Sequence, residues 1–258
     1  MTSCFVHLNA GLGNQLFQIA AGFAHCKRNG FQLSLSSSSG PIRPTYWNSF
    51  LAGCSPYVAL SAPTTGSKWN EPSFSYTAIP NDATIISGYF QSSRYFADYA
   101  SDIRTLFTPP EAIQATVRER YSHLLEKPYV VMHVRRGDYF INGNRHHGIL
   151  TSVYYKRAMA AFPDASFLIV SDDPAWCRAQ PWLTGTVILD EPDDCVSLWL
   201  MTQFRQFIIS NSTFSWWAAW LSNADAKKVV APATWFGPGG ASRWEDIYEP
   251  DWIRLPIY

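Results

Sequence analysis

Residues 129–139, YVVMHVRRGDY, begin as an apolar run and end in a cluster of charged side chains. Most of the first six residues are β-branched or aromatic; Pro128 precedes them and Gly137 follows the two arginines. Such a run is typical of a strand buried in a parallel sheet. The charged residues then lie at the carboxyl end of the strand, where open α/β sheets bind their ligands. This stretch predicts an α/β fold with a binding site at that edge.

The adjacent residues Arg135 and Arg136 predict a local anion site. A guanidinium group keeps its charge when buried, and its fork of N–H donors matches the geometry of phosphate. At a strand end, one of the two side chains can face the ligand crevice while the other faces the opposite side. Asp138 is then either a carboxylate that orients one arginine or a catalytic group. A surface turn with solvated charges is the alternative interpretation.

Composition narrows the class of protein. The 258 residues are long enough for one large or two small domains, and 47% of them are hydrophobic. The 20 basic and 20 acidic residues balance, which argues against a general attraction to nucleic acid or anionic membranes. Any anion site must therefore be local.

The sequence predicts a cytoplasmic protein, or the catalytic part of a trimmed one. No apolar run approaches the about 20 residues of a transmembrane helix, and the first residues lack the pattern of a secretion signal. The cysteines are odd in number and form no Cys-x-x-Cys pair, so neither a disulfide framework nor a zinc site is expected. We expect them to be small buried residues: Cys4, Cys26, Cys54, Cys177 and Cys195.

A second Gly-rich stretch lies near the amino terminus. Residues 4–9 predict a strand, Gly11 and Gly13 lie in the loop after it, and residues 16–24 have helical spacing of apolar side chains. A strand, loop and helix in this order can direct backbone N–H groups at a phosphate, or can simply form a tight turn. The pattern is not the dinucleotide fingerprint, because Leu16 occupies the third glycine position.

Further elements alternate along the chain. Residues 36–80, rich in Ser, Gly and Pro, predict a long irregular insertion. A domain boundary is expected near residue 126, which divides the chain into domains 1–126 and 127–258. Strands are predicted over residues 31–35, 84–90, 166–171, 186–189, 207–210 and 228–231, and helices over residues 95–107, 110–125, 152–162 and 214–221.

Three motifs resemble those of one enzyme family. Residues 133–139, HVRRGDY, resemble the His-x-Arg-Arg-x-Asp signature of the α1,2-/α1,6-/protein O-fucosyltransferase superfamily, and are most similar to the α1,2-fucosyltransferases of glycosyltransferase family 11. Residues 11–18, GLGNQLFQ, resemble the opening motif of that family, and residues 210–217, SNSTFSWW, resemble its late motif. The three occur in the family's order across most of the chain.

The resemblance implies a GT-B-like fold, with two facing Rossmann-like domains that hold the acceptor side and the donor side. It implies inverting transfer of L-fucose from GDP-β-L-fucose to the 2-hydroxyl of a terminal galactoside, which forms an α1,2 linkage. A different linkage or acceptor is the first alternative. A non-catalytic carbohydrate-binding protein is another.

The resemblance also assigns residues to the site. It makes Arg135 the first choice for a diphosphate clamp and Asp172 a reader of guanine. Trp216 and Trp217 are expected to be core residues. Tyr89 and Gln91, in the stretch GYFQ over residues 88–91, would lie on the acceptor side. The donor-binding residues it implies are Gly11, Gly13, Asn14, His133, Arg135, Arg136, Asp172, Ser212, Thr213 and Phe214.

No metal and no other cofactor is expected for this reaction. The chain lacks an Asp-x-Asp motif; residues 172–173 and 193–194 are adjacent acidic pairs. Fixed positive charge can stabilise a leaving diphosphate in place of a metal ion. The catalytic base stays open between Asp138 and the histidines of the next loop, His146 and His147, because two neighbouring arginines favour the weakly basic form of Asp138.

Overall fold

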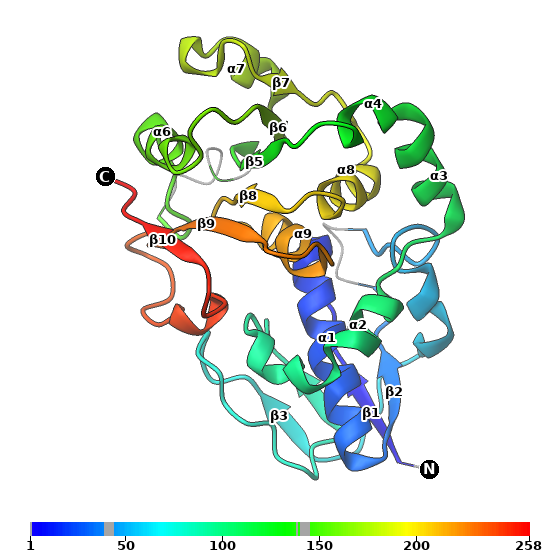
Figure 1. Cartoon of the computed structure of the whole chain (residues 1–258). Helices are drawn as coiled ribbons and strands as arrows, with labels where there is room; N and C mark the ends of the chain where they lie inside the picture. Colours follow the sequence, from blue (N-terminus) through cyan, green and yellow to red (C-terminus); the bar gives the residue numbers. More distant parts are fainter. Residues whose placement is uncertain (1, 39–43, 138, 140–144) are drawn as a thin grey trace. The chain divides into compact units, whose positions relative to one another are not determined.

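The computed structural model describes residues 2–38, 44–137, 139 and 145–258, and its internal contacts divide the chain into two units (Figure 1). The first unit comprises Met1–Pro110 and Arg243–Glu249, and the second comprises Glu111–Ser242 and Pro250–Tyr258. Helix α3 (Glu111–Arg120) packs against α8 (Asp194–Thr202) and so belongs to the second unit. The boundary predicted from the sequence, near residue 126, lies after α3 and so differs from this division.

The second unit contains a six-stranded sheet in which all neighbouring strands are parallel. Its order is β10-β9-β8-β5-β6-β7. The bounds are β5 Val130–Val134, β6 Phe167–Ser171, β7 Val187–Ile188, β8 Gln206–Ile208, β9 Lys228–Pro232 and β10 Ile253–Leu255. The predicted central strand is therefore present, and it is buried along its whole length.

The strand order of this sheet creates a switch point between β5 and β8. From β5 the chain adds β6 and β7 on one side, and then starts again with β8 on the other side of β5. The loops that follow β5 and β8 therefore diverge to opposite faces of the sheet. A crevice at the carboxyl ends of two such strands is the usual ligand site of open α/β sheets.

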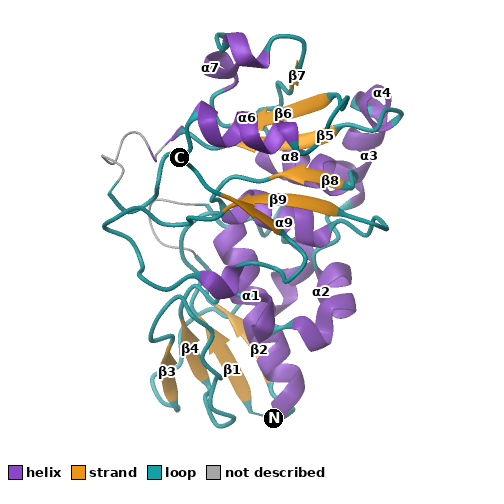
Figure 2. Cartoon of the chain, turned by 60° about the vertical axis from the view of Figure 1, so that its left-hand side comes forward, coloured by secondary structure: helices purple, strands orange, loops and turns teal. Residues whose placement is uncertain are grey.

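Helices cover both faces of this sheet, with α6 (Ser152–Ala160) on one face and α8 with α9 (Thr213–Leu221) on the other (Figure 2). Val130, Met132 and Val134 pack in a core cluster with residues of α6. His133, of the opposite side-chain parity, contacts Phe214 of α9. The two faces of β5 therefore pack against different helices, because successive side chains of a strand point to opposite faces of the sheet.

Large aromatic side chains of α9 are buried in the core of the second unit. Trp216 and Trp217 are fully buried, as predicted, and their rings meet edge to face at 5.0 Å. Trp252 packs on Trp216 at 5.7 Å and brings the last segment of the chain onto α9. This unit also contains two short helices, α4 (Ser122–Leu125) and α7 (Pro174–Arg178).

The first unit contains a four-stranded parallel sheet of order β2-β1-β4-β3. Its elements are β1 Ser3–Val6, α1 Leu12–Asn29, β2 Gln32–Leu35, β3 Lys68–Asn70, β4 Ile85–Ser87 and α2 Ala100–Leu106. Strand β3 lies in the stretch predicted to be irregular. Both β3 and β10, which was also missed, are edge strands with mostly exposed side chains, so they lack the buried apolar run that predicted the equally short strands β4 and β8.

The predicted α/β class with parallel sheets is confirmed in both units. All five cysteines are buried and free, which agrees with the interpretation of their spacing. Among the described residues, no helix combines the length and the apolar character needed to cross a membrane.

Candidate active site

Three loops meet at the carboxyl edge of the six-stranded sheet, because the ends of parallel strands lie at the same edge. Arg135 follows β5, Asp172 follows β6 and Ser210 follows β8. Asp172 Oδ2 lies 3.0 Å from Arg135 Nη1, and both side chains are 24% exposed. Asp172 Oδ1 also accepts a hydrogen bond from the backbone N–H of Arg136, at 2.9 Å. Asp172 therefore orients Arg135 while leaving its guanidinium partly accessible.

Gly137 makes this arrangement possible. A Cβ atom built at residue 137 would overlap the carboxylate of Asp172. A side chain at residue 137 would therefore require this carboxylate to shift from its position beside Arg135. The glycine is thus explained by the close approach of a carboxylate, and not only by the need to end a strand.

Arg136 is engaged on the other side of the strand, as the alternation of side chains predicts. Its Nε lies 3.2 Å from Asp173 Oδ2, and its Cζ lies 3.7 Å from the ring centroid of Trp176. Asp173 also caps α7, because its Oδ1 accepts a hydrogen bond from the N–H of Trp176 at 3.0 Å. A contact of Arg136 with the donor stays a prediction.

His133 is an interior residue that is only 3% exposed. Its Nδ1 lies 2.7 Å from Ser210 Oγ, and its ring lies 5.5 Å from that of Phe214. Burial, together with the positive charge of Arg135, lowers the pKa of His133 to about 3. The imidazole is therefore neutral at ordinary pH and ties β5 to the loop after β8, whereas its predicted contact with the nucleotide stays a prediction.

A stability measurement tests this neutral state of His133. Below about pH 6.5 the unfolded chain protonates this histidine and the folded chain does not, so folding loses stability as the pH falls from about 6.5 toward 3. We expect His133 to contribute a slope of up to about 1.4 kcal/mol per pH unit to the free energy of unfolding. His133→Gln should remove this slope, whereas His123→Gln, at an exposed position, should keep it. Equal slopes for both variants between pH 4 and 6 would contradict the burial argument.

The loop after β8 leads directly into α9. Ser212 is the N-cap residue of the helix and makes no side-chain capping hydrogen bond, while Thr213 and Phe214 begin the first turn. Ser215 Oγ lies 3.5 Å from Ser210 Oγ and holds this turn beside His133. The N–H groups and the dipole at a helix start favour an anion. The structure thus places three of the predicted donor residues beside the switch point.

An aromatic cluster that the sequence analysis did not anticipate lies next to Arg135. The ring of Tyr139 is parallel to that of His147, with 4.2 Å between centroids and 4° between planes. Arg135 Cζ lies 5.3 Å from the centroid of Tyr139. Phe236 packs against His147 at 5.8 Å, although nothing in the local sequence relates the two. Asp138, the other candidate base, lies outside the described residues.

The first unit brings together the residues predicted around its own sheet edge. Asn14 Oδ1 accepts a hydrogen bond from Gln91 Nε2 at 2.9 Å, which joins the start of α1 to the loop after β4. Gln18, which the sequence analysis did not select, bridges the same loops: its Oε1 accepts from the N–H of Asn9 and its Nε2 donates to the carbonyl of Gly88. Gly11 and Gly13 lie at the start of α1, with Gly11 as its N-cap in an extended conformation.

Glu71, just after β3, holds the stretch that contains Tyr89. Its Oε2 accepts hydrogen bonds from the N–H groups of Tyr89 and Phe90, at 2.7 and 2.8 Å. Its Oε1 accepts a third from Tyr95 Oη, at 2.9 Å, and burial raises the pKa of this carboxyl group. No signal in the sequence identifies Glu71, because it belongs to the stretch without periodicity and contacts residues that follow it in the chain by 18 positions or more.

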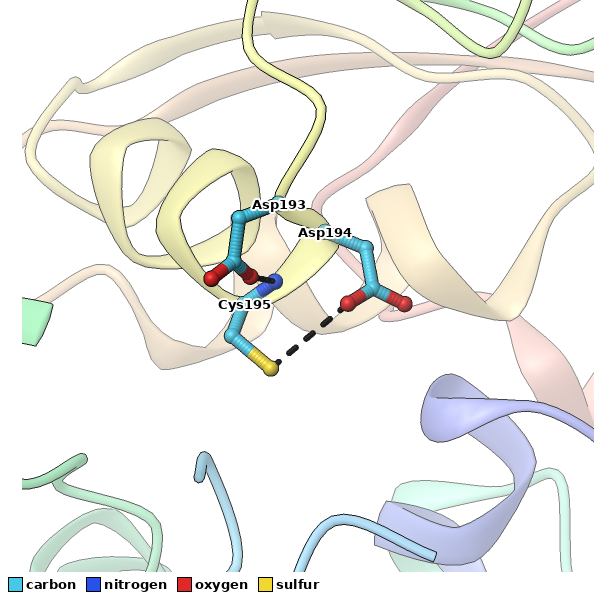
Figure 3. Close-up of side chains that lie close together, drawn as sticks. All are labelled: Asp193, Asp194 and Cys195. Atoms are coloured by element: carbon cyan, nitrogen blue, oxygen red, sulfur yellow. Dashed lines mark hydrogen bonds between the residues drawn. The ribbon is translucent and has the colours of Figure 1, made fainter. Parts of the chain in front are cut away.

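One group of possible metal ligands occurs within the described part of the chain, and it consists of Asp193, Asp194 and Cys195 (Figure 3). Asp193 Oδ1 accepts hydrogen bonds from the N–H groups of Cys195 and Val196, at 2.8 and 3.3 Å, so this carboxylate is the N-cap of α8. Capping explains Asp193 without an ion, and the position of Asp194 in the first turn of the helix is favourable to a negative charge.

Comparisons with known proteins agree on one family. The model of the family described as Glycosyl transferase family 11 matches residues 64–256. An alpha-1,2-colitosyltransferase from Escherichia coli is 28% identical and covers 99% of both chains. The galactoside 2-alpha-L-fucosyltransferase SEC1 from Bos taurus is 26% identical over 97% of this chain and 72% of its own.

Solved structures agree on the fold. The alpha-1,6-fucosyltransferase NodZ soaked with GDP-fucose aligns with a TM-score of 0.52 at 14% identity, over 85% of this chain and 92% of its own. The fucosyltransferase NodZ from Bradyrhizobium aligns with a TM-score of 0.53 at the same identity, over 84% of this chain and 93% of its own. This likeness shows a GT-B-like fold, as the motifs predicted.

Proposed function

Because the chain belongs to glycosyltransferase family 11, we propose that it is an inverting galactoside α1,2-fucosyltransferase. In this proposal it transfers L-fucose from GDP-β-L-fucose to the 2-hydroxyl of a terminal galactoside. The observation that carries the proposal is the position of Arg135, a partly accessible guanidinium at the switch point of a parallel sheet and oriented by Asp172. A fixed cation at this place suits the diphosphate of a sugar nucleotide.

The chemistry is a single displacement at the anomeric carbon. The acceptor oxygen forms a bond to C1 of the fucose with its own electron pair, and the bond from C1 to the β-phosphate oxygen breaks. That electron pair leaves with GDP, and the acceptor proton passes to a base. Attack opposite the leaving group converts the β linkage of the donor into an α linkage in the product.

Arg135 and the start of α9 stabilise the leaving group in this proposal. Negative charge grows on the β-phosphate as the bond breaks, and a preoriented cation in a partly buried site lowers the energy of that state. The N–H groups of the first turn of α9 add to this effect. The base is Asp138, His146 or His147, and no metal ion is required.

Asp172 can select the donor base as well as orient Arg135. An ionised carboxylate has about four acceptor sites, and two of them serve Arg135 and the N–H of Arg136. Guanine offers N1–H and N2–H₂ as a pair of donors to the remaining sites, and adenine has no such pair. We therefore expect preference for GDP over ADP.

A second donor deserves a direct test because of the relative from Escherichia coli, which is named as a colitosyltransferase. Similarity along the whole chain favours a GDP-colitose donor as the alternative. The acceptor can also differ, since linkage specificity resides in the loops. Assays with both GDP sugars and a panel of galactosides separate these cases from a carbohydrate-binding protein without catalysis.

Calorimetric titration with GDP, UDP and ADP in EDTA tests the core of the proposal. We expect GDP to bind and ADP and UDP to bind at least about ten-fold more weakly, because each hydrogen bond to a charged group contributes roughly 1.5–3 kcal/mol. Transfer from GDP-fucose should continue in EDTA. Activity that is lost in EDTA and restored by Mn²⁺ would contradict metal independence, and failure to bind GDP would contradict the proposed function as a whole.

A further inference from the structure

Asn211 connects three segments at the carboxyl edge of the second unit, although it is only 1% exposed. Its side-chain Nδ2 donates hydrogen bonds to the carbonyl oxygens of Gly148, at 2.8 Å, and Trp235, at 2.9 Å. Its own carbonyl oxygen accepts a hydrogen bond from Tyr139 Oη at 2.9 Å. Asn211, in the loop after β8, therefore fixes the loop after β5, the segment before α6 and the loop after β9.

Backbone hydrogen bonds reinforce the contact between two of these segments. The N–H of Gly237 donates to the carbonyl of His146 at 2.9 Å, and the N–H of Gly239 donates to the carbonyl of Arg145 at 2.6 Å. The segment that carries His147 is therefore bound to the loop that carries Phe236 along its length. The positions of both aromatic groups follow from these bonds and from Asn211.

The result is a row of side chains that begins at the diphosphate clamp. Arg135 lies over the ring of Tyr139, Tyr139 stacks on His147, and His147 stacks on Phe236 with 29° between ring planes. His146 meets His147 edge to face at 4.7 Å. The carboxylate of Asp172 and the face of Tyr139 thus both support the guanidinium of Arg135.

We propose that Asn211, acting through Tyr139, is a positioning residue that sets the orientation of the Arg135 guanidinium and of the His147 imidazole for transfer. The inference rests on the proposed function. When a diphosphate engages the N–H donors of Arg135, the pairing with Asp172 has to compete with the phosphate oxygens. The face of Tyr139 does not compete for those donors, so it keeps the guanidinium plane in place.

The chemistry of the amide explains why this position holds asparagine. The NH₂ group supplies two N–H donors, and both carbonyl partners need donors. An aspartate of the same shape has none and would place negative charge against two carbonyl oxygens. The hydroxyl of Tyr139 supplies the third link, and its ring supplies the stacking, so substitutions at Tyr139 separate the two contributions.

The test compares Tyr139→Phe and Tyr139→Leu with the wild-type protein in full-length form. Tyr139→Leu removes the ring under Arg135, and we expect GDP affinity to fall about 3- to 10-fold and kcat about 10- to 100-fold, with a changed pH profile of kcat. Tyr139→Phe keeps the ring and loses one hydrogen bond, so kcat should fall about 2- to 10-fold with GDP affinity within about two-fold of wild type.

Tyr121→Phe is the matched control, because it removes one phenolic hydrogen bond, to Glu191, elsewhere in the same unit. We expect its kcat and GDP affinity to equal those of the wild type. Asn211→Asp replaces the two donor contacts to Gly148 and Trp235 by repulsion, so its kcat should fall at least as far as that of Tyr139→Phe. If that variant does not fold, the two Tyr139 variants still decide the matter.

Several results would overturn the inference. Wild-type kcat and GDP affinity in Tyr139→Leu would do so, as would a lower melting temperature with unchanged kinetics. A loss of kcat that is uniform across pH, with GDP affinity intact, would show that Tyr139 stabilises the fold without orienting these two groups. A wild-type protein that neither binds GDP nor transfers fucose would instead reject the proposed function, so the two failures are distinguishable.

Discussion

Arg135→Ala is expected to abolish measurable binding of GDP and to lower kcat/KM for the donor by about 10²- to 10³-fold. The guanidinium is the cation that the structure places at the switch point between β5 and β8, with Asp172 holding it in orientation. Its loss removes stabilisation of the leaving diphosphate and also leaves Asp172 as an uncompensated negative charge near it. Both effects act against binding of a diphosphate.

Two further variants sharpen this prediction. Arg135→Lys keeps the charge and loses the planar fork, so we expect an intermediate loss of roughly ten-fold or more. Arg178→Ala removes an exposed ion pair with Asp190 and should leave GDP affinity and kcat/KM unchanged. GDP affinity within about two-fold of wild type in Arg135→Ala would remove Arg135 from the donor site.

Glu71→Ala is expected to produce the largest loss of stability among single substitutions of the first unit's polar residues. The carboxylate is the acceptor for the N–H groups of Tyr89 and Phe90 and for the hydroxyl of Tyr95. Each buried donor left without a partner costs roughly 1–3 kcal/mol. We therefore expect the free energy of unfolding to fall by about 3 kcal/mol or more, measured by denaturant titration.

A second effect of Glu71→Ala should concern the acceptor. Glu71 holds the loop that contains Tyr89 and Gln91, the two residues predicted to lie on the acceptor side. Gln91 also donates a hydrogen bond to Asn14. We expect the KM for the galactoside to rise by a larger factor than the Kd for GDP, because Glu71 reaches Asn14, a predicted donor-binding residue, through Gln91. Asp102→Ala, at an exposed position in the first turn of α2, should cost less than about 1 kcal/mol and serves as the control. Equal stability of the two variants would contradict the role of Glu71.

Much of the fold was predictable because it depends on local patterns. The apolar run of β5, the helical spacing in α1 and the apolar segment of α9 each specify an element within a few residues. The order of strands and helices then specifies a parallel α/β architecture. The edge strands β3 and β10 expose most of their side chains and carry no apolar run, so they were missed.

The candidate site was predictable to the extent that its residues lie at strand ends in compact motifs. Arg135, Asp172 and Ser212 all follow strands that the apolar pattern identifies, and parallel strands bring their carboxyl ends to one edge. The side-chain alternation at a strand end also indicated that the two arginines can face different ways. Arg136 packs on Trp176, whereas Arg135 lies over Tyr139.

The sequence by itself determined the α/β class, the family and the location of a cationic site, because each of these follows from short contiguous patterns. Only the tertiary structure decided which partners hold that site. Asp172 lies 36 positions from Arg136, Asn211 lies 72 positions from Tyr139, and Gln91 lies 77 positions from Asn14. Hydrogen bonds between such distant residues leave no local signature, since they depend on how loops from separate strands pack at one sheet edge.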